Sequence, residues 1–304
     1  MRLNLGSKNF KQDIAKLLDM VEGRALFHSK NSLPTPLHLI VQERSANIRF
    51  VPLPVPGCLC SVSKGFDIFV QTHAKDSQNL LEKFLNGKDS QLPVRHRFTI
   101  AHEIAHTYFY DLSKQPPSMQ FPPNTAKELR RMEEACDAIA NRMLLPRFIL
   151  EEHVKKHDCL DPNLLRELAN KAAVSPQVVI SAFGGSAKCL PHKGGIACAL
   201  HDGESYRLTS FSLGGLLKDR FDLIKGQRLS EWIKPSDFVA NGGRKSEVIF
   251  RRTGKNDPKT IYSFKARFER VPVPAAKVNY FVTVSELEAG QPDLLRSSDD
   301  QGVD

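Results

Sequence analysis

The sequence lacks the features of a membrane or secreted protein. Its longest apolar runs, such as PLHLIV and RMLLP, fall far short of the roughly 20 residues that span a bilayer. The stretch MRLNLGSKNFKQDIAKLLDM carries acidic side chains and has neither the apolar core nor the small-residue cleavage site of a signal peptide. We therefore expect a cytoplasmic protein without a membrane partner.

Cysteine is sparse and scattered. The six cysteines lie between Cys58 and Cys198 without a C-x-x-C pair, so a fold held together by disulfides is excluded and we expect reduced thiols. Internal repeats are absent as well. What is present is a chain of 304 residues with 41% hydrophobic and 25% charged residues, which is ordinary for a soluble protein of two or three globular units.

Basic side chains are in excess. Lys and Arg number 43 against 34 Asp and Glu, a net charge of +9, which favours contact with polyanions at long range. This charge is weak support for DNA as a partner, because a basic balance alone does not identify a DNA-binding protein. The excess is uneven, because the final stretch SELEAGQPDLLRSSDDQGVD is acidic and is expected to be a disordered tail.

The order of helical and strand patterns predicts an α+β protein. An amphipathic helix is expected at residues 10–22, followed by short strands between residues 37 and 70 (LHLIVQ, IRFVPL and FDIFVQ). A helix containing HEIAH follows Pro93, and the proline-rich loop QPPSMQFPPN separates it from a long helix at 126–145. Short helices are expected at 147–185. Strands then alternate with loops from about residue 190 to residue 287.

The segment RFTIAHEIAHTYFY contains the motif HExxH at His102, Glu103 and His106. Residues four apart lie on one face of a helix, so both imidazoles can point at one metal ion. Glu103 is rotated off that line, where a general base can take a proton from metal-bound water. The helix is otherwise apolar, and burying three polar side chains in it without a metal would be costly.

A third metal ligand is expected from the next helix, MEEACDAIANRMLLP. Glu133 and Asp137 are again four apart. Glu133 would complete a His₂Glu site for Zn²⁺. Asp137 would accept the spare N–H of a metal-bound histidine and thereby fix its tautomer. Glu134 is the competing candidate for the third ligand.

These two helices resemble the ImmA/IrrE family of metallopeptidases. The resemblance is specific over residues 95–147 and extends back to about residue 10. The family usually has Asn where this chain has Asp137, although Glu-x-x-x-Asp is also the pattern of thermolysin-like zinc proteases. The positions that carry the resemblance are Arg97, Phe98, His102, Glu103, His106, Glu133, Leu144, Leu145 and Pro146.

The resemblance implies a zincin-like metallopeptidase domain at 1–150, a helix-turn-helix-like segment at 151–188, a GAF-like sensor domain at 189–287 and an acidic tail at 288–304. This layout is similar to that of the radiation-response (PprI-like) branch of the family. The implied activity is a zinc endopeptidase, with Mn²⁺ as an alternative ion. It would make a specific cut in a regulatory protein, characteristically a helix-turn-helix transcriptional repressor, and so switch on a stress or DNA-damage response.

Two points stay open. The segment LRELANKAAVSPQVVISAF has a helix-turn-helix rhythm with Ser175 as helix cap, yet its second helix carries no Arg, Lys or Asn to read bases. Packing or substrate docking is therefore favoured over DNA binding. The rival to the enzyme is a non-enzymatic transcriptional regulator with a structural metal and a C-terminal part that binds DNA or a ligand. Structural zinc sites have four protein ligands, and the sequence offers three.

Overall fold

A computed structural model describes residues 5–156, 162–184, 194–201, 206–213, 245–253, 261–271 and 278–286. The chain divides into two units. One contains Met1–Asp158 and Leu165–Cys189, and the other contains Cys159–Leu164 and Leu190–Asp304. The boundaries of the four predicted domains stay predictions, and the predicted tail at 288–304 lies outside the described residues.

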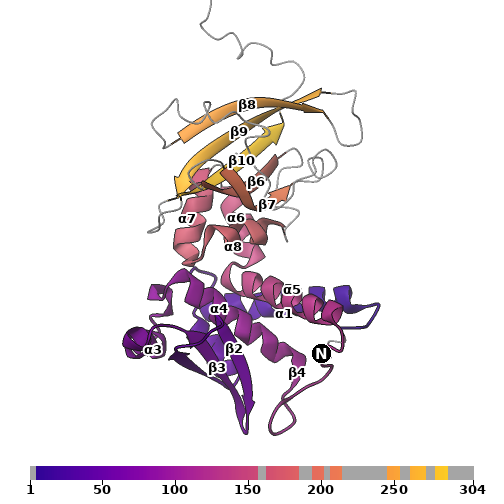
Figure 1. Cartoon of the computed structure of the whole chain (residues 1–304), viewed down its shortest axis with the longest axis vertical. Helices are drawn as coiled ribbons and strands as arrows, with labels where there is room; N and C mark the ends of the chain where they lie inside the picture. Colours follow the sequence, from indigo (N-terminus) through magenta and orange to yellow (C-terminus); the bar gives the residue numbers. More distant parts are fainter. Residues whose placement is uncertain are drawn as a thin grey trace, which may run out of the picture. The chain divides into compact units, whose positions relative to one another are not determined.

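Helices and short strands alternate over the first part of the chain (Figure 1). The helices are α1 (Phe10–Ser29), α2 (Leu37–Glu43), α3 (Ser77–Leu85), α4 (Val94–His106), α5 (Ala126–Leu144), α6 (Arg147–Lys155), α7 (Pro162–Ala172) and α8 (Pro176–Gly184). The strands are β1 (Ala46–Val51), β2 (Gly57–Val62), β3 (Gly65–Gln71), β4 (Tyr110–Asp111) and β5 (Ser118–Met119), and the 3₁₀ helices are η1 (Ala74–Asp76), η2 (Asp89–Gln91) and η3 (Thr107–Phe109).

A small mixed sheet supports the helix that carries HExxH. Its strand order is β1-β3-β2, with β1 parallel and β2 antiparallel to β3. Phe66, Ile68 and Val70 of β3 are fully buried, and α4 packs against β3 and β2 (Figure 1). The alternation of β3 therefore points its apolar side chains at α4. Helices with a small mixed sheet are what the sequence predicts for this region.

The prediction of a strand at LHLIVQ is wrong. Residues Leu37–Glu43 form helix α2, which buries Leu37, Ile40 and Val41. These positions are spaced as i, i+3 and i+4, which suits a helix, but so short an apolar run does not decide between the two structures. A side chain far along the sequence favours the helix, because the carboxylate of Asp89 accepts a hydrogen bond from the backbone N–H of Leu37 at 2.9 Å. This bond satisfies a donor in the first turn of the helix.

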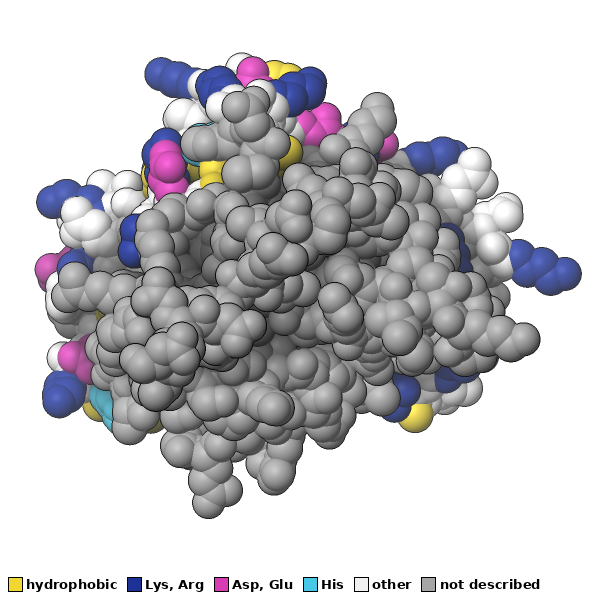
Figure 2. Space-filling view, turned by 90° about the horizontal axis from the view of Figure 1, so that it is seen from above, with side chains coloured by type: hydrophobic (Ala, Val, Ile, Leu, Met, Phe, Trp, Pro, Cys, Tyr) yellow, Lys and Arg dark blue, Asp and Glu magenta, His cyan; other side chains and the backbone are white. Residues whose placement is uncertain are grey.

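The surface carries charges of both signs. Figure 2 shows lysine and arginine side chains at separate points around the margin of one face, with acidic side chains between them. In the described part of the chain, no helix combines the length and apolar character that crossing a bilayer requires.

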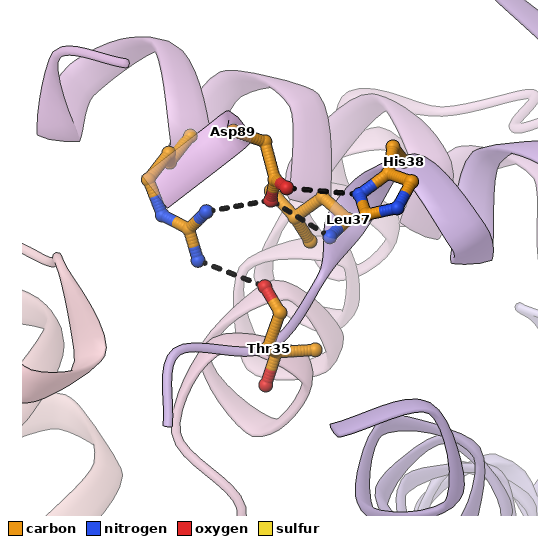
Figure 3. A network of polar contacts seen from close by, with 5 residues as sticks. Thr35, Leu37, His38 and Asp89 are labelled. Carbon is orange, nitrogen blue, oxygen red and sulfur yellow. Dashed lines mark hydrogen bonds and ion pairs between the residues drawn. The ribbon is translucent and has the colours of Figure 1, made fainter. Parts of the chain in front are cut away.

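A buried ion pair fixes the start of α4 (Figure 3). The side chain of Arg97 is fully buried and donates to Asp89 Oδ2 at 2.7 Å and to the carbonyl oxygen of Thr35 at 3.0 Å. The other oxygen of Asp89 lies 2.9 Å from His38 Nδ1. Burial lowers the pKa of the Arg97 guanidinium, while the charge and hydrogen bond of Asp89 raise it. The pair therefore joins α4 to η2 and to the beginning of α2.

Helix α5 is held at both ends. At its start, Thr125 Oγ1 accepts from the N–H of Glu128 at 3.1 Å, and Glu128 in turn accepts from the N–H of Asn124 at 2.9 Å. Near its end, Arg142 donates to the buried carboxylate of Glu22 on α1 at 2.8 Å. Polar residues at the cap and a carboxylate from another helix thus position α5 against α1 and α4.

Helices α7 and α8 occupy the segment predicted to resemble a helix-turn-helix. Ala173 follows the last residue of α7 and has a left-handed φ of 51°. Ser175 Oγ lies 3.4 Å from the N–H of Val178. Helix α8 buries Val178, Val179, Ile180 and Phe183. Its apolar side is therefore occupied by packing, and a role in DNA binding stays a prediction.

The second unit contains an antiparallel sheet. Its strands are β6 (Gly194–His201), β7 (Tyr206–Leu213), β8 (Lys245–Thr253), β9 (Ile261–Val271) and β10 (Val278–Glu286). Their order is β7-β6-β10-β9-β8. The β patterns IACALH, SYRLTSFS, SEVIFRRT, TIYSFKARFERV and VNYFVTVSEL predict strands at these five places, and the structure confirms them. The sequence also predicts a helix at KDRFDLIKGQRLSEWI, which lies outside the described residues. The GAF-like assignment stays a prediction.

Replacing Arg97 by Met should lower the free energy of unfolding of the first unit by about 3–5 kcal/mol, because the buried carboxylate of Asp89 loses its counter-charge. Urea denaturation followed by circular dichroism measures the change. Arg95→Met is the matched control, since Arg95 is exposed on the same helix and should change stability by less than about 0.5 kcal/mol. Equal effects of the two substitutions would contradict the structural role assigned to Arg97.

Candidate metal centre

Two helices bring three potential ligands together. His102 and His106 lie one turn apart on α4, and Glu133 faces them from α5. The Nε2 atoms of the two histidines are 3.2 Å apart. Glu133 Oε2 lies 3.2 Å from His102 Nε2, and Glu133 Oε1 lies 3.7 Å from His106 Nε2. Among the described residues, the group that could hold a metal has these three members.

The spacing of these atoms fits a small tetrahedral cation. With bonds of about 2.0–2.1 Å to each ligand, the edges of a tetrahedral site are about 3.3–3.4 Å long. The donor atoms of His102, His106 and Glu133 already stand 3.2–3.7 Å apart. Nitrogen and carboxylate donors of this kind suit Zn²⁺. The residues therefore fit the ion that the sequence predicts.

Asp137 lies where it can fix the tautomer of His102. The Nδ1 atom of His102 lies 2.9 Å from Asp137 Oδ1, and a carboxylate can only accept, so Nδ1 carries the hydrogen. The Nε2 atom of neutral His102 is then a lone-pair donor that faces Glu133 Oε2, also an acceptor. Two acceptors at 3.2 Å require a proton or a metal ion between them.

The competing candidate, Glu134, lies elsewhere. Together with Asp137 it lines a cavity of about 430 Å³ whose walls come from α1, α5 and α8, and it is not a member of the ligand group. One residue along a helix is a rotation of about 100°, which turns Glu134 away from the histidines. The role of each residue as a ligand remains a prediction, and the geometry favours Glu133.

Glu103 lies beside the ligands in a confined space. Only 7% of its surface is exposed. A Cβ atom placed on Gly57 of β2 would stand 3.0 Å from Glu103 Oε1 and 2.5 Å from Thr99 Cγ2. The backbone of β2 therefore packs directly on the carboxyl group of Glu103, and no larger residue fits at position 57 without a shift.

A comparison of the sequence with models of protein families finds a match. The family model of Peptidase_M78, described as the IrrE N-terminal-like domain, matches residues 68–182. This range includes both helices of the candidate centre. Residues 68–182 are therefore similar to the Peptidase_M78 domain. We refer to this part as the M78 domain.

Other comparisons add little about function. No protein with curated functional information matches the sequence. A solved structure titled "Mycobacterium tuberculosis transcriptional regulator" is similar, with 13% sequence identity, a TM-score of 0.46, and coverage of 89% of this chain and 88% of that chain. A likeness of this size carries no argument about function.

Burial and neighbouring charges shift the pKa values of Glu103, His102 and His106 in the M78 domain in different directions. Burial raises the pKa of Glu103 to about 7, with the charge of His102 lowering it and that of Glu133 raising it. Burial lowers the pKa of His102, but the hydrogen bond and charge of Asp137, with smaller effects of Glu103 and Glu133, raise it overall. Burial and then the charge of His102 lower the pKa of His106. The site thus holds a carboxyl group that can exchange a proton near neutral pH.

Sequence patterns do not reveal every residue that shapes the M78 domain. Arg44 donates to the hydroxyl and the carbonyl oxygen of Thr107, both at 2.9 Å, and stacks over the ring of Tyr108 at 4.3 Å. These contacts hold the end of α4 just after His106. Arg44 is 63 residues from Thr107 in sequence, so helical spacing gives no signal for the contact.

Glu133→Gln should lower the affinity for zinc by at least about 100-fold, because loss of a ligand costs at least as much as loss of its hydrogen-bonding support. Glu134→Gln is the matched control and should leave the affinity unchanged. Competition with a chromophoric zinc chelator measures both. If Glu134→Gln lowers the affinity for zinc and Glu133→Gln does not, Glu134 is the third ligand.

The raised pKa of Glu103 predicts how the stability of the metal-free protein depends on pH. Between pH 4.5 and about 7, folded Glu103 keeps a proton that the unfolded chain releases, so the free energy of unfolding falls as the pH rises through this window. A glutamine at position 103 does not titrate, so the Glu103→Gln variant should not lose this part of the free energy of unfolding. Above pH 7 the variant should be more stable than the wild type by about 3 kcal/mol, a difference that disappears below pH 4.5.

Urea unfolding of chelator-treated protein between pH 4.5 and pH 8 tests this expectation. Glu134→Gln, at an exposed position, serves as the control and should follow the wild-type curve. Parallel pH profiles for the wild type and Glu103→Gln would show that Glu103 does not titrate in this window.

Proposed function

We propose that the protein is a zinc-dependent endopeptidase that cuts a regulatory protein at a specific site. One observation carries the proposal. The donor atoms of His102, His106 and Glu133 lie within 4.8 Å of one another, next to the buried carboxyl group of Glu103. The match to Peptidase_M78 supports the same chemistry.

His102, His106 and Glu133 would hold the ion. When bound, zinc supplies Lewis-acid polarisation of a carbonyl group and lowers the pKa of a coordinated water. Three protein ligands leave a coordination position free, as catalytic zinc sites require. Asp137 keeps His102 in the tautomer that presents Nε2, because it accepts the hydrogen on Nδ1.

Glu103 would transfer the proton. In the metal-free protein, burial raises the pKa of Glu103 to about 7, and a carboxyl group whose pKa is raised in this way can serve in turn as general base and general acid. Glu103 takes the proton from the attacking water and then gives it to the amine that leaves. Packing by the β2 backbone at Gly57 holds the carboxyl group in one position for both steps.

The proposed substrate is a helix-turn-helix transcriptional repressor in the cytoplasm. Its cleavage would derepress the genes of a stress or DNA-damage response. The support is the family resemblance of the two site helices, together with α8. This helix lies beside α5 and contributes Ser181 and Ala182 to the cavity that also contains Asp137. A partner bound at this cavity would reach the side chains around the metal centre.

A non-enzymatic regulator is the alternative. It would need a closed metal site of four ligands, whereas the ligand group of the described residues has three members. Direct DNA binding is disfavoured because α8 carries no Arg, Lys or Asn, and Gln177 is its one amide side chain. Both features favour the enzyme.

Substitution of Glu103 by Gln tests the proposal. The variant should bind zinc as the wild type does and should cleave at least about 100-fold more slowly, because it cannot accept a proton. The measurement is co-expression with candidate helix-turn-helix repressors encoded in the same genome, scored for a discrete fragment, alongside metal analysis of the purified protein. His102→Ala is the control that should lose both metal and cleavage. Cleavage at the wild-type rate by Glu103→Gln would refute the mechanism.

A further inference from the structure

Two thiols lie side by side on the strand that packs against Glu103. Cys58 and Cys60 are two residues apart on β2, so their side chains project from the same face of the strand. The Cys60 thiol is one of the neighbouring groups that raise the pKa of the Cys58 thiol. Both are free, Cys60 exposed and Cys58 partly buried. Nothing in the zinc mechanism uses this pair.

The pair can form a disulfide if the strand bends. Two residues of a strand span about 6.6 Å between Cα atoms, at the upper end of the range of about 4.4–6.8 Å for disulfides. The Cβ atoms of such neighbours are about as far apart, and a disulfide needs about 3.5–4.5 Å between them, so closing the bond requires a local bend that brings them about 2–3 Å closer. β2 can bend in this way because it is at the edge of its sheet, bonded on one side to β3.

We propose that Cys58 and Cys60 are an oxidation site, at which a peroxide converts the two thiols into an intramolecular disulfide and thereby lowers the activity of the neighbouring centre. The second half of this proposal rests on the proposed peptidase function. The first half concerns the two thiols alone.

The reaction takes two steps. The exposed sulfur of Cys60, once deprotonated, attacks one oxygen of hydrogen peroxide, which leaves a sulfenic acid on Cys60 and releases water. The sulfur of Cys58 then attacks the Cys60 sulfur, and the hydroxyl group leaves with the Cys58 proton as a second water. Two thiols and one peroxide give one disulfide and two waters. Burial, together with the neighbouring thiol and Glu103, raises the pKa of Cys58, which suits it to the second step rather than the first.

Gly57 connects this bond to the catalytic carboxyl group. It immediately precedes Cys58, and its backbone is so close to Glu103 that an added Cβ atom would lie 3.0 Å from Oε1. A strand that bends at residues 58–60 must shift Gly57 or twist it. Either movement displaces Glu103 from its position for proton transfer, and a displacement of about 1 Å can reduce a rate by about 100-fold.

The test treats zinc-loaded full-length protein with hydrogen peroxide and maps its thiols. Trypsin releases residues 50–64 as one peptide that contains Cys58, Cys60 and no other cysteine. After oxidation, this peptide should lose two hydrogen atoms in mass and resist alkylation until dithiothreitol is added. Buried Cys136, whose pKa is raised by burial, should remain a thiol. Failure to form this disulfide, or a dimer linked through Cys60, would overturn the proposal.

Activity is then compared in the same samples. Peroxide should slow cleavage by about tenfold or more, with recovery on reduction, whereas Cys58→Ser and Cys60→Ser should have wild-type activity and be insensitive to peroxide. A disulfide that leaves cleavage unchanged, or serine variants that remain sensitive, would refute the regulatory half. If reduced, zinc-loaded protein cleaves no substrate at all, the proposed function fails, and the peptide mass still decides whether the oxidation site exists.

Discussion

The buried ion pair between Arg97 and Asp89 fixes the helix on which the candidate centre depends. Arg97 is a charged group without exposed surface, so its position is tolerable only where Asp89 and the carbonyl oxygen of Thr35 surround it. That requirement allows one orientation of α4 about its axis. With Arg97 facing inward toward η2, His102 and His106, five and nine residues later, face α5. The direction in which the two imidazoles point thus follows from the position of Arg97.

Within the M78 domain, two glutamates near the histidines have opposite environments. Glu103 is 7% exposed, whereas the side chain of Glu133 is 45% exposed. The more exposed carboxylate of Glu133 suits a metal ligand. The buried one holds its proton up to a higher pH and suits proton exchange. One residue type therefore serves two purposes, and the difference arises from solvent access.

The sequence predicts those parts of the structure that depend on spacing along one chain segment. The histidines of α4, the candidate ligand of α5 and the helical boundaries at Pro93 and Pro146 all follow from local pattern. The strand expected at LHLIVQ (residues 37–42) is part of helix α2, whose first turn Asp89 stabilises from 52 residues away. Likewise, the contact between Gly57 and Glu103 joins a strand to a helix. Such contacts are formed by the fold, and no periodicity encodes them.

Helices α4 and α5 pack against each other, and both bury small residues, among them Ala101 and Ala105 on α4 and Cys136 and Ala140 on α5. Small side chains let two helix backbones come close, and here the closeness sets how far apart the donor atoms stand. Calcium, with bonds of about 2.3–2.6 Å and six to eight oxygen ligands, would have to push these helices apart. The close approach of the two helices therefore limits the size of the ion that the three ligands can surround.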